Sequence, residues 1–316
     1  MSLYPRNLSE YVASLGVPHG PDSRVYIVDP ENGDDDHFGE SWDKPLKTLI
    51  AAEDKCVADQ HDAVLFIARA DADNPTAAIA WDKDYTHLIG VGSPLPGLGN
   101  RSRVVLAAAT ALTPCITFSG NGCIVKNMQF GNEKAAGAAA GVAIITGQRC
   151  YFENVFFMVP FATDAASYSV KLSGGENTFK RCTFGQTTAL RTAASYGLWV
   201  HKGAGDNQRN KFIDCEFLSW ASAATHTLVY TDVDIDNEGF SLFFENCLFD
   251  NLVSGAGTLT VAIDDNCAVY HQILLRGQGN CFAGVAAVAA PLTYVLKAET
   301  GTGTQSGLLM ATVNEA

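Results

Sequence analysis

One pattern of apolar and polar positions recurs five times along the chain. Each copy ends in a phenylalanine, and these fall at residues 130, 157, 184, 217 and 249, so the steps between them are 27, 27, 33 and 32 residues. Apolar side chains stand five and two residues before that phenylalanine, as Phe212 and Cys215 do before Phe217. A repeat at this period indicates stacked structural units rather than a globular α/β core.

The spacing within each copy predicts short strands joined by a bend. Steps of two residues are strand periodicity, and the single step of three requires a corner if the same face is to stay inward. Asn and Asp tolerate the left-handed backbone region, so they suit such a corner. The corner position holds Asn127, Asn154, Asp214 and Asn246, which we expect to stack as a ladder. In the remaining copy the corner residue is Arg181, which departs from this Asn/Asp pattern.

The inward face is predicted to be a stack of aromatic and thiol side chains. The residues expected there are Phe130, Phe157, Phe184, Phe217, Phe249, Cys182, Cys215 and Cys247. A sixth, degraded copy is expected at residues 268–275, with Leu275 in the place of the terminal phenylalanine. Each copy follows a further strand-like run, for example residues 141–146 and 197–200, which gives coils of two or three short strands.

These coils resemble the right-handed parallel β-helix of the pectin-lyase-like superfamily, in which an Asn at one corner of each coil stacks into a ladder. The resemblance implies an all-β solenoid with coils of about 27 residues, of the kind also found in tailed-bacteriophage virion proteins. An antiparallel sandwich is the alternative, but sandwiches lack a fixed period of this size.

The segment at residues 26–57 resembles the entry segment of such β-helices. Leu46, Leu49, Ile50 and Val57 fall near helical spacing, which predicts an N-terminal capping helix, and residues 63–68 follow as the first buried strand. A cap at an open β-helix end prevents edge-to-edge pairing. We therefore expect an N-terminal arm at 1–24, the β-helix at 25–290 and a C-terminal arm or cap at 291–316.

Composition narrows the function classes. The chain has 316 residues and a formal net charge of −13, which disfavours nucleic acid as a partner because a phosphate-binding groove needs clustered Lys and Arg. The sequence contains no run of 18 apolar residues, the length that would indicate a membrane span. The N-terminus lacks an apolar signal core, so we expect synthesis in a host cytoplasm. The nine cysteines are expected to be free thiols, without disulfide, metal or cofactor roles.

Candidate chemistry is sparse in the sequence. Asp232, Asp234 and Asp236 alternate and are weak calcium candidates, and residues 33–40 form a second acidic loop. The pair Asp264 and Asp265 is expected in a solvated turn. His201, Lys202 and Arg209 form a basic cluster in the first of the longer steps. The Gly-His-Gly and Arg-Ile-Lys motifs of polygalacturonase-like relatives are absent, so no catalytic set is assigned.

The termini predict contact with other chains. Leu8, Tyr11, Val12 and Leu15 follow the spacing of a two-turn amphipathic helix, which is too short to be stable alone and so must dock on something. Residues 301–316 are expected to form an extended arm.

Two functions follow by analogy of architecture. We expect a non-enzymatic virion protein on the capsid exterior, a decoration or cement protein with the major capsid protein as partner. A homotrimer is a further option for its assembly. The alternative is a tailspike-like polysaccharide lyase or glycosidase that acts on host surface glycans.

Overall fold

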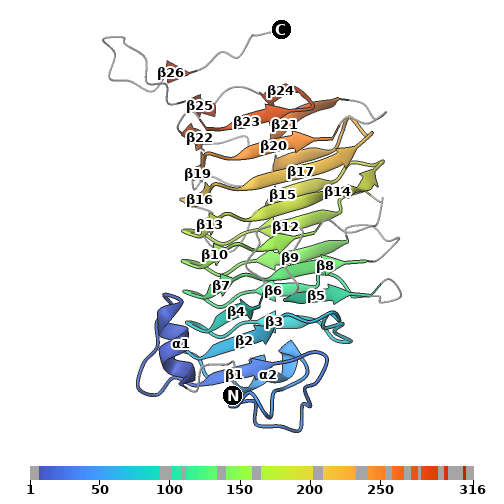
Figure 1. The fold of residues 1–316 in the computed structure, drawn as a ribbon. Helices are drawn as coiled ribbons and strands as arrows, with labels where there is room; N and C mark the ends of the chain where they lie inside the picture. The colour runs from blue at the N-terminus through green and yellow to red at the C-terminus, as the bar shows by residue number, and fades with distance from the viewer. Residues whose placement is uncertain are drawn as a thin grey trace.

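The computed structural model describes residues 7–92, 102–107, 112–133, 140–158, 165–201, 209–232, 241–252, 258–266, 272–276, 279–290, 295–297 and 309–310. Its strands stack into an elongated prism with the N-terminal part of the chain at one end and the C-terminal part at the other (Figure 1). The chain is an all-β parallel solenoid, as the repeat predicts. The coil spacing averages about 31 residues rather than 27, because several coils carry longer connections between strands.

The prism has three faces, each a parallel sheet. In the described part of the chain these sheets hold 11, 7 and 8 strands, and we call them sheets A, B and C. Sheet A contains β1 (Val25–Val28), β2 (Ala63–Ile67), β4 (His87–Val91), β7 (Ile124–Lys126), β10 (Tyr151–Glu153), β13 (Thr178–Lys180), β16 (Asn210–Ile213), β19 (Ser241–Glu245), β22 (Gln272–Arg276), β25 (Val295–Lys297) and β26 (Leu309–Met310). The last pair, β25 and β26, is antiparallel.

The other two faces complete each coil. Sheet B contains β5 (Arg103–Leu106), β8 (Gln129–Asn132), β11 (Phe156–Phe157), β14 (Thr183–Arg191), β17 (Glu216–Ala221), β20 (Leu248–Asn251) and β23 (Cys281–Ala283). Sheet C contains β3 (Ile79–Trp81), β6 (Ile116–Phe118), β9 (Gly141–Ile145), β12 (Tyr168–Leu172), β15 (Tyr196–Val200), β18 (Thr227–Thr231), β21 (Leu259–Asp265) and β24 (Val285–Ala290).

The sequence repeat becomes a stack inside the prism. Parallel pairing places equivalent residues of successive coils side by side at the inter-strand spacing of about 4.8 Å. The rings of Phe184 and Phe217 are stacked with centroids 4.8 Å apart, and Phe217 and Phe249 repeat this distance. All five predicted phenylalanines are buried, as are Cys182, Cys215 and Cys247, and no cysteine that the structure describes is in a disulfide.

The corners between sheets A and B carry the predicted polar residues. Asn127, Asn154, Asp214 and Asn246 all have φ between 53° and 55°, in the left-handed region. The side-chain amide of Asn154 donates to Asn127 Oδ1 over 2.8 Å, so successive corners are linked. Arg181 adopts the same backbone geometry with φ 52° and pairs with Glu153 instead of continuing the amide ladder.

The predicted register of the sixth copy is wrong. Leu275 pairs with Phe244, whereas the partner of the terminal Phe249 is Phe282. The corner of this coil is longer than the others, and the amide of Asn280 within it accepts a hydrogen bond from Cys247 N over 2.8 Å. The fixed spacing between the apolar positions of one copy therefore does not predict the register of this coil.

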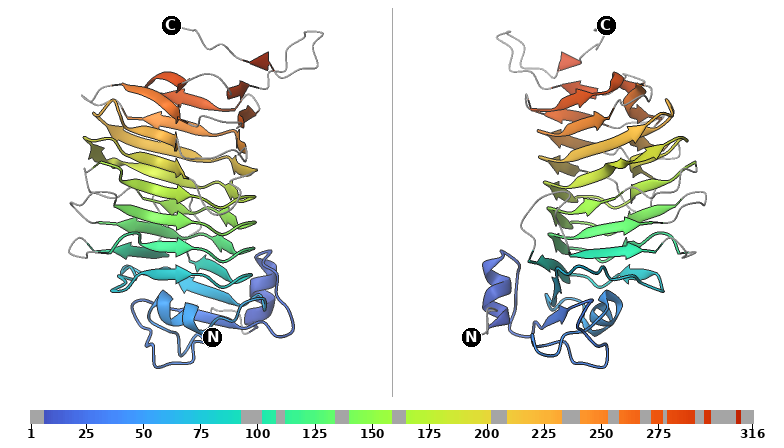
Figure 2. Two further views of the ribbon diagram at one scale, coloured as in Figure 1. Left: turned by 180° about the vertical axis from the view of Figure 1, so that it is seen from behind. Right: turned by 45° about the vertical axis from the view of Figure 1, so that its right-hand side comes forward.

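The predicted partner-binding stripe is instead packed against the chain itself. Helix α1 (Leu8–Ser14) begins after the N-cap residue Asn7 and lies beside the outer face of β1 and β2 (Figure 2). Val12 is fully buried in a cluster with the outward-facing Ile27 and Leu65, and Leu8, Tyr11 and Leu15 pack around it. Lys126 Nζ donates to Leu15 O over 2.8 Å at the helix C-terminus. The first coils expose apolar residues on both faces of the sheet, and this explains why α1 docks there.

Helix α2 (Leu49–Lys55) lies at the N-terminal end of the prism, where a cap is expected. Leu49 and Ala52 join the interior cluster, whereas Val57 lies beyond the helix and is 45% exposed. The acidic loop at 33–40 supports this helix, because Asp35 accepts hydrogen bonds from Lys47 N and Thr48 N.

The first buried strand is β1 rather than β2. The domain boundaries stay a prediction, and most of 291–316 lies outside the described residues.

Candidate functional site

The outer face of sheet C carries a column of chemically active side chains. Lys171, Trp199, Tyr230 and Asp264 are register partners on β12, β15, β18 and β21. Their neighbours in the strands, such as Val170 and Leu172, point into the interior. Strand alternation therefore turns these four residues outward, and parallel pairing sets them at successive inter-strand spacings.

Trp199 is the centre of this cluster. Lys171 Nζ lies over its ring, 4.3 Å from the ring centroid. His201 approaches the same ring edge-on, with centroids 5.3 Å apart and planes at 71°. A cation over an indole face is attracted by the ring quadrupole, and this fixes the ammonium group in place. One tryptophan thus positions two ionisable side chains.

His201 and Asp232 form a pair at the ends of β15 and β18. His201 Nδ1 lies 2.7 Å from Asp232 Oδ2, and the two side chains are 31% and 13% exposed. Backbone bonds from His201 N to Leu172 O and from Asp232 N to Val200 O hold both residues in register with the preceding coil. A carboxylate on Nδ1 orients an imidazole for proton transfer, so the pair has the geometry of an acid–base dyad.

Burial shifts the pKa of two groups in the column. The pKa of Lys171 is lowered because burial penalises its charged form, although Asp232 acts in the opposite direction. The pKa of Asp264 is raised, mainly by burial and further by the adjacent Asp265. A lysine that loses its proton more readily and a carboxylic acid that retains its proton are the groups that acid–base chemistry requires near neutral pH.

Aromatic side chains extend the surface beside this column. The rings of Tyr196 and Tyr230 are stacked with centroids 4.3 Å apart. Burial raises the pKa of Tyr196, and the nearby carboxylates Asp264 and Asp232 add to this effect. Tyrosine and tryptophan present an apolar ring together with a polar group, which suits a ligand that is partly apolar and rich in hydroxyls. We call this group of residues (Tyr196, Trp199, Tyr230, Lys171, His201, Asp232 and Asp264) the sheet C site.

Several residues singled out in the sequence lie elsewhere. Asp264 and Asp265 belong to strand β21 rather than to a solvated turn, and the buried Asp265 accepts a 2.7 Å hydrogen bond from Thr231 Oγ1. Asp234, Asp236 and Lys202 lie outside the described residues, whereas Asp232 pairs with His201. Within the described ranges, no group of three or more His, Cys, Asp or Glu side chains is arranged to hold a metal ion. No helix in the described part is long and apolar enough to cross a membrane.

The sequence analysis missed Lys171, Trp199 and Tyr230. Each occupies an ordinary outward position of a strand, so none forms a local motif. The signal was present across coils, because these outward positions align when the phenylalanine repeat sets the register. Reading that column would have brought Lys171, Trp199, Tyr230 and Asp264 together.

Comparison with solved structures establishes the fold class. Pectate lyase Pel9A superposes with a TM-score of 0.52 at 14% sequence identity, covering 84% of this chain and 65% of the lyase. The pectin methylesterase from Aspergillus niger superposes with a TM-score of 0.51 at 11% identity, covering 92% and 94%. The chain has the right-handed parallel β-helix fold of the pectin-lyase-like proteins. No protein-family model and no curated protein matches the sequence.

A viral protein is also similar to this β-helix. Geobacillus virus E2 ORF18 superposes with a TM-score of 0.48 at 13% identity, covering 87% of this chain and 61% of the viral chain. The chain spans less than two thirds of the length of that protein and of Pel9A. At these identities the similarity concerns the fold, and the lyase and the esterase are named for different activities. The function must therefore be argued from the side chains of the sheet C site.

Proposed function

We propose that this β-helix is a polysaccharide lyase that cleaves a uronate-containing glycan at the sheet C site. The observation that carries the proposal is the packing of Lys171 and His201 against one tryptophan, Trp199. This arrangement supports an enzymatic role, in contrast to the non-enzymatic role expected from the sequence.

The chemistry is a β-elimination. Lys171, in its neutral form, removes the proton on the carbon next to the uronate carboxyl group. A carbon–carbon double bond then forms as the glycosidic carbon–oxygen bond breaks, and the leaving oxygen takes a proton from His201. The lowered pKa of Lys171 supports its role as the base, and Asp232 orients the imidazole.

The substrate class follows from the rest of the site. Tyr196 and Tyr230 offer apolar rings against which pyranose faces can pack, and Asp264 offers a carboxyl group to sugar hydroxyls. The solved structures of similar fold include enzymes named for pectate and pectin, and this agrees with the proposed substrate class. A glycosidase mechanism is less well supported, because it needs two carboxyl groups flanking the bond and Asp232 is engaged by His201.

The virion functions remain predictions. The apolar stripe on α1 motivated the decoration-protein hypothesis, and it is occupied by the outer face of β1 and β2. The capsid exterior as location, the major capsid protein as partner, the homotrimer, and the tailspike-like setting of a glycan-cleaving enzyme are untested.

The proposal is tested by ultraviolet absorbance of the unsaturated product on polygalacturonate, alginate, hyaluronan and chondroitin. Lys171→Ala and His201→Ala are each expected to lower kcat by about 100-fold or more. Lys44→Ala, which removes an exposed lysine in the N-terminal loop, is the matched control and should leave kcat unchanged. Absence of unsaturated product from all four polymers, or full activity in Lys171→Ala, would overturn the proposal.

A further inference from the structure

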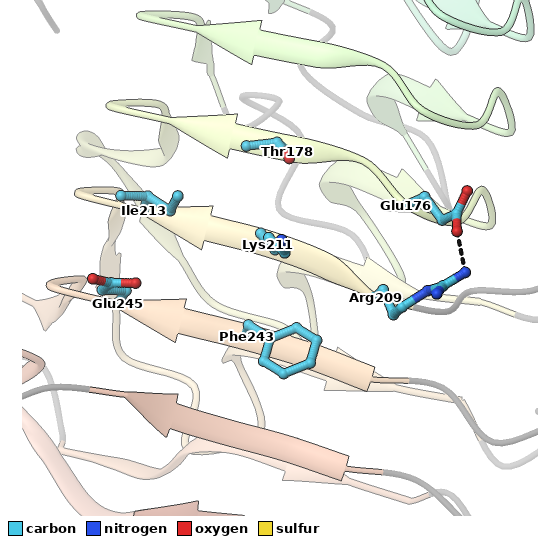
Figure 3. A pocket seen from close by; sticks show the side chains of 7 residues that line it. All are labelled: Glu176, Thr178, Arg209, Lys211, Ile213, Phe243 and Glu245. Atoms are coloured by element: carbon cyan, nitrogen blue, oxygen red, sulfur yellow. Dashed lines mark hydrogen bonds and ion pairs between the residues drawn. The ribbon is translucent and has the colours of Figure 1, made fainter. Parts of the chain in front are cut away.

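A concave surface lies on a different face of the prism from the sheet C site. On the outside of sheet A, strands β13, β16 and β19 form a cavity of about 580 Å³, whose lining includes Lys211, Ile213, Phe243 and Glu245 (Figure 3). Lys211 is a register partner of Phe243, and Ile213 is a register partner of Glu245. We call this surface the sheet A groove. Its volume lies within the range of small-ligand sites.

One end of the sheet A groove is built from an ion-pair cluster. Figure 3 shows Glu176 and Arg209 facing each other across the start of β13 and β16. Glu176 also pairs with Arg149 of the preceding coil, with Arg149 Nε 2.6 Å from Glu176 Oε2. One carboxylate is therefore shared by two guanidinium groups, and this leaves the cluster with a net positive charge.

Two lysines and a second carboxylate complete the charges at the sheet A groove. Lys211 is exposed and enters no ion pair with a residue that the structure describes. Lys180, which lies outside the lining on β13, the preceding strand of sheet A, likewise enters none. Glu245 is the opposing carboxylate within the lining. The lining itself is balanced, with Glu176 and Glu245 against Arg209 and Lys211. Arg149 and Lys180 beside it supply a local excess of positive charge in a chain whose net charge is −13. The flanking positive charges attract anions.

The composition of the lining suits a saccharide better than a simple anion. Phe243 lies beside Lys211 and Ile213 lies beside Glu245, so apolar and charged side chains alternate across the lining (Figure 3). A pyranose ring can pack its apolar face on such a surface, while Glu245 accepts hydrogen bonds from hydroxyls and Lys211 pairs with a carboxylate.

The sheet A groove and the sheet C site lie on overlapping coils. Strand β16 is the strand of sheet A that follows β15, and β19 is the one that follows β18. Lys211 and Trp199 are therefore on one coil, and Phe243 and Tyr230 are on the next. A polymer bound at the sheet C site would need to turn one corner of the prism to reach the sheet A groove.

We propose that the sheet A groove is a second binding site for an anionic polysaccharide, separate from the site of cleavage. The proposal takes its ligand class from the charges and the apolar lining of sheet A. It therefore holds or fails independently of catalysis at sheet C.

The test is affinity electrophoresis of the full chain in gels that contain polygalacturonate, with carboxyl-reduced polymer as the neutral comparison. All variants carry Lys171→Ala, so that the polymer is not cleaved. Adding Lys211→Ala is expected to weaken binding by about threefold to fivefold, the size of one exposed ionic contact. Adding Lys44→Ala should have no effect. Phe243→Ala should weaken binding to both polymers, and its thermal unfolding shows whether the sheet is intact.

The outcomes separate the two proposals. Weaker binding with Lys211→Ala, whether or not the wild type cleaves any polymer, supports the sheet A groove as a saccharide site. Unchanged retardation in Lys211→Ala would overturn it, even if cleavage at the sheet C site is confirmed. Equal affinity of the wild type for duplex DNA and for polygalacturonate would also overturn it, because the surface would then bind any polyanion.

Discussion

The ammonium group of Lys171 lies 4.3 Å from the centre of the Trp199 ring on the outer face of sheet C. Burial lowers the pKa of this lysine, although the attraction of the indole ring for a cation by itself favours the ammonium form. The contact joins two adjacent coils, since the two residues are register partners on β12 and β15. The packing contact fixes the position of the proposed base, and burial makes that base lose its proton more readily.

The first prediction concerns pH. Because the pKa of Lys171 is lowered, its neutral form appears at a lower pH than for an exposed lysine, and kcat should rise with pH through that lowered value. Lys171→Arg keeps the positive charge at all working pH values, so it should bind polymer but lose this rise together with most of kcat. A pH–rate profile of the wild type that is flat above neutral pH would contradict the assignment of Lys171 as the base.

The second prediction concerns the thiol stack. Cys215 is 1% exposed between Cys182 and Cys247, and burial holds its pKa well above the usual range. All three thiols should resist alkylation in the native protein, whereas the exposed Cys281 should react. Cys215→Asp should lower the free energy of unfolding by about 3–5 kcal/mol through a buried unpaired charge, against roughly 1 kcal/mol for Cys215→Ala. Peptide mapping after labelling and urea unfolding check both statements; rapid native labelling of Cys215 would refute the register.

The third prediction concerns the corner ladder. Asn154 combines a φ of 54° with a 2.8 Å amide bond to Asn127. Asn154→Val should cost about 1–3 kcal/mol, because a β-branched side chain resists the left-handed region and the amide bond is lost. Asn154→Gly keeps the backbone geometry and should cost less than Asn154→Val. Equal losses in the two variants, measured by urea unfolding, would show that backbone strain contributes nothing at this corner.

The fourth prediction concerns helix α1. Val12 is fully buried against the outer face of β1 and β2, so Val12→Asp should undock the helix and expose that apolar face. We expect faster proteolysis within residues 7–24 and a lower unfolding temperature. Ala13→Asp places the same charge at an exposed position of the same helix and is the control. Proteolysis of Val12→Asp at the wild-type rate would mean that α1 is not held by its own sheet.

The sequence predicted the coils well and the site poorly, for a physical reason. Phe184 and Phe217 define the interior through a spacing that strand geometry imposes, and Asn154 marks a backbone bend, so local chemistry carries the fold. The pairing of His201 with Asp232 depends instead on which residues meet across coils. The docking of α1 depends on Ile27 and Leu65, which are apolar on the outward side of β1 and β2. A strand that is apolar on both sides is also what a fully buried strand looks like in sequence, so the pattern did not reveal the helix that covers it. In the sixth coil, the corner between Leu275 and Phe282 is longer than in the other coils. Leu275 therefore pairs with Phe244, and Phe282 takes the place that the fixed spacing had assigned to Leu275.

The central claim is that the sheet C site cleaves a uronate-containing glycan by elimination, and the masses of the products formed from a defined uronate oligomer test it most directly. Elimination transfers a proton without consuming water, so the summed product masses should equal the mass of the oligomer, and one product should carry the double bond. The account predicts this result for the wild type and its loss in Lys171→Ala. Products whose summed mass exceeds that of the oligomer by one water would show hydrolysis and would contradict the account.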